Sequence, residues 1–597
     1  MGCNLLRFRS ERNLEDILTN QQKTLIGTPA APGLAHGKTV IITKQDLVVP
    51  EYEIKDSQAE LERLNRAIKI SQEEILSLKA ILSEEAKGNE AEIFEAHWMF
   101  LEDEALVGLA RDAIEQAVNA EKAWMDAVEH YAQMLEQIPD ETLSARAVDI
   151  RDVGRRVLGH LLGVKINQTA LTEPSIIVAV DLTPSDTVSL DKDYVLAFCT
   201  AEGGPTSHTA VLAKTFGFPA VVGLGKEIMT VPEGTTLLVD GSKGKVVVDP
   251  IEEDRLSFFR QEASQKSHQE EARIAAQEPA MTADGDRIEV VANVGGSQDA
   301  PLGVKFGAEG VGLFRTEFLY LDRNSLPTEE EQVEAYKSVF GFYKNLPMVV
   351  RTLDIGGDKV IPYLNFPQEM NPFLGWRGIR MLDGEEELFL NQFRALLQAG
   401  ALADVDLRIM MPMVSGIKEV RAGKAILEKA KSQLSNEGKP YTEKVQLGIM
   451  IEVPSAALMA DQLAKEVDFF SIGTNDLTQY TLAVDRTNSK VAHIGNPLDP
   501  AVLRLIKMTI DNAHSEGKWV GLCGELAGEP IAAPILLGLG LDEFSMAPTR
   551  IPDIKKVMRN LYKDDCRQLA NEVLVMADAE DVIAHSRAFL NHMDLDF

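Results

Sequence analysis

Two spacings of apolar residues alternate along the chain. From Pro50 to about Asn167, apolar residues recur at i, i+3 and i+4, as at Leu61, Leu64 and Ile68, and strand signals are scarce. This is the period of amphipathic helices that bury one face. We therefore predict a helical block over residues 51–167.

Apolar, β-branched runs bounded by Gly and Pro predict strands on both sides of this block. One run precedes it at 38–43, and the others follow at 175–180, 194–198, 219–223 and 236–241. We therefore predict that the helical block is inserted into a small α/β domain made of residues 25–50 and 168–250.

Two segments lack the strand pattern. Residues 1–24 are polar and unpatterned and are predicted to be an N-terminal tail. Residues 251–283 are rich in Glu, Gln, Ala, Lys and Arg, which favour helices, and are predicted to be a linker helix.

After Gly285, short apolar runs alternate with helical stretches to the end of the chain. Eight strand candidates begin near Ile288, Gly310, Met348, Leu407, Leu447, Val467, Trp519 and Glu543. Such alternation predicts a (β/α)8 barrel over residues 284–597, with chemistry on the loops after the strands. The predicted fold class is therefore multidomain α/β: an α/β domain with an inserted helical domain, followed by a (β/α)8 barrel.

Polar residues cluster where five of the eight predicted barrel strands end. The groups are Arg315-Thr316-Glu317 after the second strand, Arg351 and Arg377 after the third, Glu452 after the fifth, Asn475-Asp476 and Arg486 after the sixth, and Cys523 after the seventh. Because the strands of such a barrel are parallel, these ends share one mouth.

The residue types at this mouth indicate an anion and a metal ion. Four arginines would repel one another unless an anion lies among them, and guanidinium forks suit phosphate or carboxylate oxygens, to which Asn475 can also donate. Glu452 and Asp476 supply hard oxygen ligands, as expected for Mg²⁺ that shares its sphere with phosphate and water. Each arginine can instead pair with a neighbouring carboxylate. Cys523 can exchange a proton with a ligand or be a buried apolar residue.

A second candidate site lies in the predicted α/β domain. Residues 201–214 form a glycine turn that runs into a helix, with His208 in the first helical turn and Thr206 or Ser207 as the cap. A helix start suits an anion, so a histidine there can carry a phosphoryl group. The alternative is a capped helix with an incidental surface histidine, and the polar barrel mouth favours the first interpretation.

Charge and composition exclude several function classes. The net charge of −32 argues against binding nucleic acid or an anionic membrane. No apolar run or signal peptide predicts membrane insertion, and the four cysteines lack paired spacing, which is typical of a cytoplasmic protein. Residues 51–150 hold 24 acidic and 9 basic residues, net −15. They are either solvated helix faces or a docking surface for a small basic protein.

Two long motifs resemble those of the phosphoenolpyruvate-utilising enzymes. Residues 203–210, Gly-Gly-Pro-Thr-Ser-His-Thr-Ala, resemble the phosphohistidine signature, and residues 468–479 resemble the second signature of the family. Inserted helices, a histidine domain and a C-terminal barrel, with no ATP-grasp domain, resemble the enzyme I family of the bacterial sugar phosphotransferase system. The resemblance runs from about Leu25 to near the C-terminus.

This resemblance implies a mechanism. Phosphoenolpyruvate binds the barrel through Mg²⁺, and a swivelling histidine domain, moving on the 251–283 hinge, takes the phosphoryl group and passes it to a histidine of the carrier protein HPr on the acidic helices. A homodimer through the barrel is also implied. The implied roles are metal ligands for Glu452 and Asp476, phosphate contacts for Arg315, Arg351, Arg377, Asn475 and Arg486, phosphoryl acceptor for His208, orientation of the imidazole for Thr187, and protonation of the enolate to pyruvate for Cys523.

Some features depart from the pattern of the family. Pro205 stands where many members carry Arg, which removes a positive charge beside His208, and Lys214 also replaces an Arg. A pyruvate phosphate dikinase or phosphoenolpyruvate synthase would need a nucleotide-binding domain before the histidine, for which there is no length. Residues 1–24 are too short for the sensory domain of a nitrogen-branch paralogue. This length favours the sugar branch, and the alternatives that stay open are a nitrogen-branch paralogue and a catalytically silent regulator.

Overall fold

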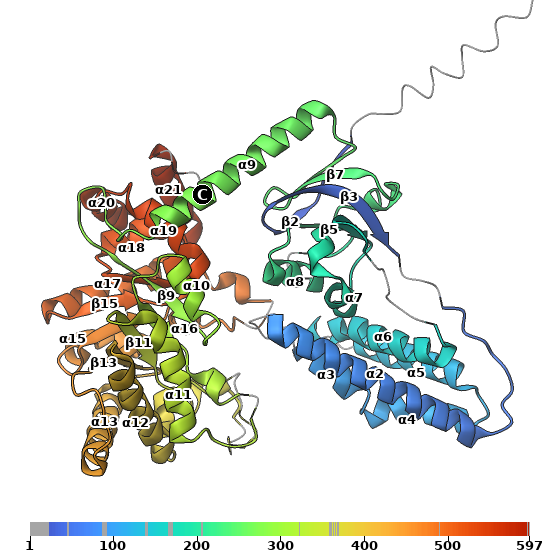
Figure 1. The fold of residues 1–597 in the computed structure, drawn as a ribbon, viewed down its shortest axis with the longest axis horizontal. Helices are drawn as coiled ribbons and strands as arrows, with labels where there is room; N and C mark the ends of the chain where they lie inside the picture. The colour runs from blue at the N-terminus through green and yellow to red at the C-terminus, as the bar shows by residue number, and fades with distance from the viewer. Residues whose placement is uncertain are drawn as a thin grey trace, which may run out of the picture. The chain divides into compact units, whose positions relative to one another are not determined.

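The computed structural model describes most of the chain from Lys23 onward. The described residues are 23–593 and Leu595, except 44–46, 86–91, 138–140, 165–170, 205–206, 322, 358–360, 362, 365, 367–368, 487 and 489. The chain divides into two compact units, Met1–Ser264 and Gln265–Phe597, and helix α9 (Glu252–Ala275) spans the boundary between them (Figure 1). No helix in the described ranges is both long and apolar enough to cross a bilayer.

Unit 1 contains an eight-stranded sheet with the order β1-β8-β7-β3-β4-β5-β6-β2. Strands β3 to β6 are parallel, whereas β1, β2, β7 and β8 pair antiparallel to their neighbours. The strands are β1 (Lys23–Ile26), β2 (Thr28–Ala31), β3 (Leu34–Ile42), β4 (Ser175–Ala179), β5 (Val195–Thr200), β6 (Ala220–Val222), β7 (Thr236–Asp240) and β8 (Lys245–Val248). Strand β1 begins inside the segment that the sequence predicted as a tail, whose residues 1–22 lie outside the described ranges.

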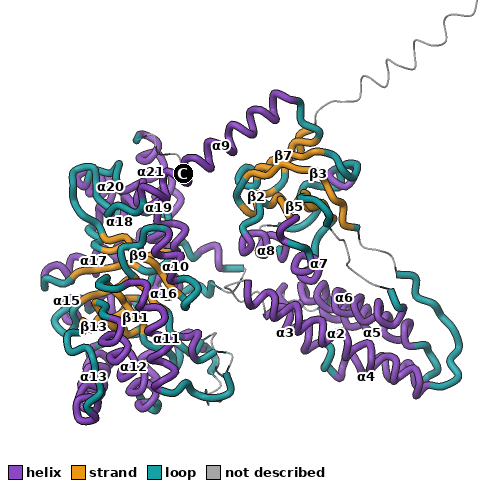
Figure 2. Tube along the Cα trace, viewed as in Figure 1, coloured by secondary structure: helices purple, strands orange, loops and turns teal. Residues whose placement is uncertain are grey.

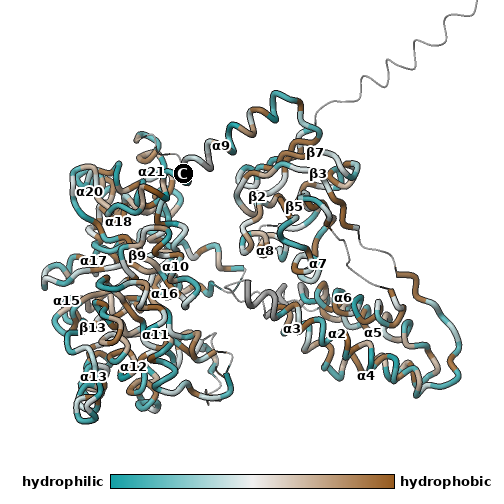
Figure 3. Tube along the Cα trace, in the orientation of Figure 1, coloured by the Kyte–Doolittle hydropathy of each residue, from teal (hydrophilic) through white to brown (hydrophobic). Residues whose placement is uncertain are grey.

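A block of helices interrupts the sheet between β3 and β4, as the sequence predicted (Figure 2). Its helices are α2 (Ser57–Glu85), α3 (Glu92–Phe100), α4 (Glu104–Glu115), α5 (Ala120–Glu136) and α6 (Glu141–Leu162). Their apolar faces bury Phe94 and Trp124, and the Trp124 indole N–H donates to the Gly154 carbonyl at 2.9 Å. Apolar and polar stretches alternate along each helix (Figure 3), because one face packs inward and the other meets water.

Two short helices cover part of the sheet: α7 (Pro184–Ser189) and α8 (His208–Phe216). A capping box closes the start of α7, in which Thr183 accepts from the Asp186 N–H and Asp186 accepts from the Thr183 N–H. Val188 of α7 and Leu212 of α8 join the core of the helical block. The two helices therefore tie the helical block to the sheet.

Unit 2 is a closed barrel of eight parallel strands, which confirms the predicted fold class. Each strand begins within two residues of its predicted start. The strands are β9 (Glu289–Val294), β10 (Val311–Phe314), β11 (Pro347–Arg351), β12 (Asp406–Met411), β13 (Gln446–Ile451), β14 (Phe469–Ile472), β15 (Trp519–Leu522) and β16 (Glu543–Met546).

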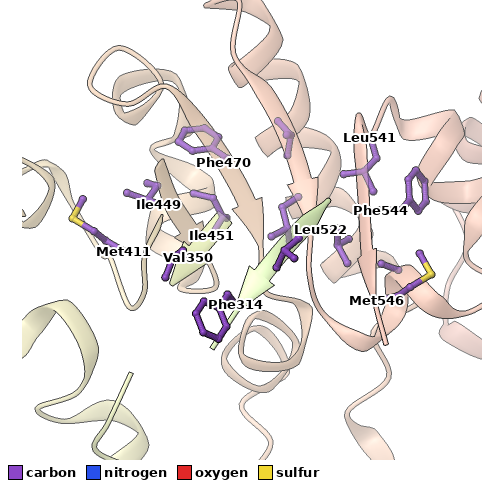
Figure 4. Packing of buried hydrophobic residues seen from close by; sticks show 14 of the residues in the cluster. Phe314, Val350, Met411, Ile449, Ile451, Phe470, Leu522, Leu541, Phe544 and Met546 are labelled. Atoms are coloured by element: carbon purple, nitrogen blue, oxygen red, sulfur yellow. The ribbon is translucent and has the colours of Figure 1, made fainter. Parts of the chain in front are cut away.

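Helices surround the barrel and bury the outward-facing strand residues in one large core (Figure 4). The helices are α10 (Ala300–Lys305), α11 (Glu329–Phe340), α12 (Glu386–Ala403), α13 (Ile417–Glu437), α14 (Pro454–Leu458), α15 (Ala460–Leu463), α16 (Thr474–Leu482), α17 (Pro500–Ser515), α18 (Ala533–Leu539), α19 (Ile551–Met558), α20 (Lys563–Val573) and α21 (Ala579–His592). A separate apolar cluster of strand side chains, including Met450, Phe469 and Cys523, is enclosed by the barrel strands.

The C-terminal end of α9 is fixed to the barrel unit by a buried lysine. Lys555 of α19 is fully buried, and its ammonium donates to the carbonyls of Ala276, Glu278 and Gly307 at 2.8–3.0 Å. A cation at this point also complements the negative end of the helix dipole. The last turn of α9 therefore belongs firmly to unit 2.

Candidate functional site

The carboxyl ends of the barrel strands hold the candidate site residues of unit 2. Arg351 is the last residue of β11, and Arg315, Glu452 and Cys523 directly follow β10, β13 and β15. Asp476 lies in the first turn of α16, after β14. Parallel strands bring all of these ends to one rim of the barrel.

Two of the predicted arginines lie in a buried network of ion pairs. The Arg351 guanidinium is 2.8 Å from Glu317 and 3.1 Å from Asp354. The Arg377 guanidinium donates to both oxygens of Asp354 at 2.9 Å and to Asp476 at 3.0 Å. All five side chains are less than one-tenth exposed. Asp354 therefore holds both guanidinium groups at once.

These carboxylates decide how two of the arginines are balanced. Burial by itself lowers the pKa of Arg377, but the charges of Asp354 and Asp476 outweigh it and raise the pKa. Of the two alternatives that the sequence left for the arginines, pairing with neighbouring carboxylates holds for Arg351 and Arg377, whose repulsion is therefore offset by the chain itself. Guanidinium groups held in this way are oriented before any ligand arrives.

The other two arginines are more accessible. Arg315 is exposed, and Arg486 is 40% exposed at 3.7 Å from Asp476. The Arg486 guanidinium also lies over the ring of Phe373, 5.8 Å from its centre. These two side chains are therefore the ones whose charge is least offset by close carboxylates.

Glu452 is a buried carboxyl at the mouth. It is 1% exposed and accepts a 2.6 Å hydrogen bond from the backbone N–H of Met413, a non-glycine residue with a left-handed φ of 59°. Such a backbone costs on the order of 1–3 kcal/mol, which other contacts must offset. Burial and the charges of Asp354 and Asp476 raise the pKa of Glu452 to about 8.

The electrostatics of Glu452 and Asp476 suit a bound Mg²⁺ ion. A buried carboxyl repelled by neighbouring carboxylates gains most from a nearby cation. Among the described residues no group of three or more His, Cys, Asp and Glu side chains could hold a metal ion by itself. Glu452 and Asp476 supply two oxygen ligands. They suit an ion such as Mg²⁺, which commonly takes its remaining ligands from water and phosphate.

Cys523 and Asn475 lie at adjacent strand ends. Cys523 is 4% exposed, and its thiol is 3.7 Å from the Ile472 carbonyl. Burial raises the pKa of the thiol to about 11, so the thiol is protonated at neutral pH and can give up a proton. Asn475 donates to Glu525 at 3.3 Å and accepts from its N–H at 3.4 Å. The buried, protonated thiol is therefore consistent with both roles considered for Cys523, apolar packing and proton donation.

His208 is the first residue of α8, in unit 1. Ser207 is the N-cap and accepts from the Ala210 N–H, and Gly203 has a φ of 97°, which favours glycine in the preceding turn. The half-buried imidazole therefore stands where the free N–H groups of the helix start gather. Pro205 and Thr206 lie outside the described residues.

Thr187 is buried in α7, which contacts α8. Among the described residues its hydroxyl donates to the carbonyl of Thr183 at 3.1 Å, one turn earlier. This is the bond of a helical threonine with its own backbone. A role toward the imidazole would require the hydroxyl to exchange this partner.

Sequence reasoning missed several carboxylates beside the site. Glu317 was part of a strand-end motif, and Asp354 follows Arg351 by three residues, but the sequence alone indicated no role for either of them. Asp149 of α6 was also missed: it is 2% exposed, lies 3.5 Å from His97, and interacts electrostatically with His208. Asp149 lies between Ala147 and Ile150, which are both buried, and this position next to apolar residues is the feature that could have indicated a buried carboxylate.

Three family models match successive parts of the chain. They are described as "PEP-utilising enzyme, N-terminal" at residues 26–146, "PEP-utilising enzyme, mobile domain" at 171–244 and "PEP-utilising enzyme, PEP-binding domain" at 269–562. The last of these covers the strand ends described above.

Curated relatives match nearly the whole chain. Proteins named phosphoenolpyruvate-protein phosphotransferase from Bacillus subtilis (strain 168) and Geobacillus stearothermophilus are each 44% identical to it, over 562 and 566 residues. The protein of that name from Enterococcus faecalis is 45% identical over 569 residues. Each alignment covers 94% of this chain and 98% of the relative. The chain therefore belongs to the phosphoenolpyruvate-protein phosphotransferases, within the family of PEP-utilising enzymes.

Proposed function

We propose that the protein transfers the phosphoryl group of phosphoenolpyruvate to His208 and then to a histidine of the carrier protein HPr, releasing pyruvate. This is the first step of the bacterial sugar phosphotransferase system. The observation that carries the proposal is the buried network at the barrel mouth. Within it, Asp354 orients two guanidinium groups beside Glu452 and Asp476.

The arginines bind the substrate phosphate. Arg351 and Arg377 are already oriented, so little side-chain entropy is lost when an anion arrives. Arg315, Arg486 and the Asn475 amide add donors from neighbouring strand ends. Guanidinium groups that follow the phosphoryl oxygens through the transition state offset the charge that moves there, and this stabilisation accounts for most of the catalysis in such transfers.

Glu452 and Asp476 would hold Mg²⁺. The ion would supply a positive charge against the phosphate and the enolate oxygen. The protein's part is to keep these two carboxylates close together and largely dry, with the Met413 N–H fixing one oxygen of Glu452.

The transfer breaks the bond between phosphorus and the enolate oxygen and forms a bond between phosphorus and the imidazole, in our proposal at Nε2 of His208. The electron pair of the broken bond stays on the enolate, and the thiol of Cys523 gives a proton to its terminal carbon, which yields pyruvate. The thiolate then regains a proton from water. A thiol whose pKa lies near 11 is protonated before the reaction, as this step requires.

His208 must visit two sites in this scheme. The domain of residues 25–50 and 168–250 carries it, with residues 251–283 as the hinge. Thr187 would orient the imidazole. Movement between donor and acceptor sites is a familiar use of hinged domains in group transfer.

We assign the acceptor site to the helical domain, residues 51–167, whose net charge suits a small basic carrier such as HPr. We also propose a homodimer through the barrel, residues 284–597, and a cytoplasmic location. A nitrogen-branch paralogue would use the same chemistry with another carrier, and a silent regulator would have no use for the oriented arginines.

Labelling with ³²P-phosphoenolpyruvate and Mg²⁺ tests the proposal. We expect an acid-labile, base-stable label that moves to HPr when it is added and that is abolished by His208→Ala. His585→Ala, which removes a surface histidine of α21 paired with Glu572, is the matched control and should label normally. Undiminished labelling of the His208→Ala variant would refute the assignment.

A further inference from the structure

The barrel has a cavity at the opposite end from the candidate active site. It lies at the amino ends of the strands, has a volume of about 550 Å³, and its wall includes Glu289, Arg408, Gln446, His514, Trp519 and Glu543. We call it the floor cavity. Glu289, Gln446, Trp519 and Glu543 are the first residues of β9, β13, β15 and β16. The proposed phosphoryl transfer gives it no role.

Glu543 is the unusual residue of this wall. Its side chain is 1% exposed, and within the described part of the chain neither carboxyl oxygen has a hydrogen-bond partner. A Cβ on Gly521 of the neighbouring strand would come within 2.7 Å of one of these oxygens, so the glycine leaves the carboxyl its space. Buried polar atoms almost always have partners, and a carboxyl with two unpaired oxygens calls for an explanation.

The nearest cation does not provide the missing partner. Arg408 approaches Glu543 only to 4.0 Å and Glu289 to 3.9 Å. Its guanidinium instead donates to Asp406 at 2.9 Å and lies over the Trp519 ring, 4.8 Å from the ring centre. Arg408 is thus held on two other groups while Glu543 stays without a donor.

The charges around Glu543 favour a cation. Burial and the nearby Glu289 raise the pKa of Glu543 to about 8, with Asp542 adding to the effect and Arg408 opposing it. The other Lys and Arg side chains of the wall each face a carboxylate: Arg287 and Glu309 at 2.6 Å, Lys563 and Asp286 at 2.9 Å, and Arg567 and Asp564 at 2.8 Å, while the His514 ring lies 2.8 Å from Asp542. Glu543 is therefore the carboxyl of this wall to which a bound cation would add a close positive charge.

We propose that the floor cavity binds a small molecule through a primary ammonium group, which donates to Glu543 and Glu289. An ammonium supplies three donors and one positive charge, which suits Glu543, whose two oxygens lack a donor among the described residues, and the nearby Glu289. A bare metal ion is a poorer fit, because the cavity is far larger than an ion and the described residues include no metal-binding group of three. The site is separate from the substrate mouth.

Binding has a proton signature. The ammonium stabilises the ionised carboxylate, so the proton of Glu543 leaves for the solvent as the new ion pair forms. Because burial and Glu289 raise the pKa of Glu543, more of the chains release a proton on binding at pH 7 than at pH 9. Affinity should therefore rise from pH 7 to pH 9, while an alkylammonium remains charged throughout.

Calorimetric titration of the full chain with pentylammonium chloride tests the proposal, with sodium pentanoate as the probe of opposite charge. Titrations in phosphate and in Tris at each pH give the number of protons released. We expect saturable binding of pentylammonium only, with close to one proton released at pH 7. Equal binding of pentanoate, no saturable heat with pentylammonium, or binding without proton release would each overturn the proposal.

Variants locate the site. Glu543→Gln should weaken pentylammonium binding at least tenfold and abolish proton release, and should leave the rate of phosphohistidine labelling unchanged. Glu572→Gln, at a half-buried position of α20 away from the floor cavity, is the control and should bind as the parent does. Unchanged binding by Glu543→Gln would overturn the assignment. If that variant fails to fold, the pH dependence of proton release in the unaltered protein still decides the question.

Discussion

Asp354→Asn is the substitution that most directly tests the ion-pair network at the barrel mouth. Asparagine keeps the shape of the side chain and removes its charge. In the structure this carboxylate, 1% exposed, holds Arg377 through two 2.9 Å hydrogen bonds and lies 3.1 Å from Arg351. The substitution leaves both arginines buried with one carboxylate fewer.

The size of the effect follows from what remains. Removing one partner of a buried ion pair costs about 3–5 kcal/mol, because the other charge stays buried without compensation. Glu317 still contacts Arg351, and Asp476 still contacts Arg377. We therefore expect the free energy of unfolding of the barrel to fall by about 4 kcal/mol rather than by twice that.

Activity should fall further than stability alone explains. Arg351 and Arg377 lose their common anchor, and a misplacement of about 1 Å in such groups lowers a rate on the order of 10²-fold. We expect kcat/KM for phosphoenolpyruvate to drop by about this factor, measured by initial rates of phosphohistidine labelling well below the unfolding temperature.

Glu437→Gln is the matched control. Glu437 also holds an arginine, Arg394, through hydrogen bonds of 2.9 and 2.8 Å, but it is 43% exposed and lies away from the strand ends. It should cost little stability, because the exposed pair is screened by water, and it should leave kcat/KM unchanged. If Asp354→Asn unfolds at the same urea concentration as the parent and keeps kcat/KM within threefold, the proposed role of Asp354 is wrong.

Three further predictions concern the Cys523 thiol, the Glu329 carboxylate and the acidic surface of α2. Cys523→Ala should slow pyruvate formation and leave the binding of phosphoenolpyruvate intact in equilibrium titrations, whereas an undiminished rate would assign the thiol to packing. Burial raises the pKa of Glu329, but hydrogen bonds from Arg394 and neighbouring groups outweigh it and lower the pKa to about 2. This stability is complete above about pH 4.5 and is lost as pH falls toward 2, so Glu329→Gln should cost about 3 kcal/mol in urea unfolding at pH 7 and little near pH 2. Glu62→Lys with Glu73→Lys, two exposed changes on α2, should slow transfer to HPr several-fold at low salt in stopped-flow assays, and equal rates would favour solvation as the role of these charges.

The barrel was predictable because its signal is repeated and local. Each strand is a short apolar run, and the eight runs recur with helical stretches between them, so an error in one would not change the fold. Strand β2 was missed because Pro29 interrupts a run of only four residues. Helix α7 was missed although Thr183 and Asp186 form a capping box, because six residues give no helical period.

The site was predictable in its residue types but not in its pairings. Arginine and carboxylate at strand ends could be read from single positions. That Arg377 contacts Asp476, far along the chain, depends on how the strands are placed around the barrel, which local spacing does not contain. The left-handed backbone of Met413, which supplies the N–H for Glu452, has no sequence signal, because methionine has no preference for that conformation.

The two ends of the barrel handle a buried carboxyl differently, and the difference bears on function. Glu452 and Glu543 are both about 1% exposed, and burial raises the pKa of each to about 8. At the mouth, Arg351 and Arg377 oppose the shift and a backbone N–H holds one oxygen of Glu452, so that carboxyl is prepared for a partner that arrives with phosphate. At the floor, Arg408 opposes the shift from 4.0 Å, and both oxygens of Glu543 lack a donor among the residues that the structure describes. A barrel that needed Glu543 only for packing would be at least as stable with glutamine or methionine there, since neither desolvates a carboxyl. The free energy of unfolding of Glu543→Gln therefore separates the two roles. If the variant is as stable as the parent while ammonium binding is lost, the carboxyl serves a ligand and not the fold.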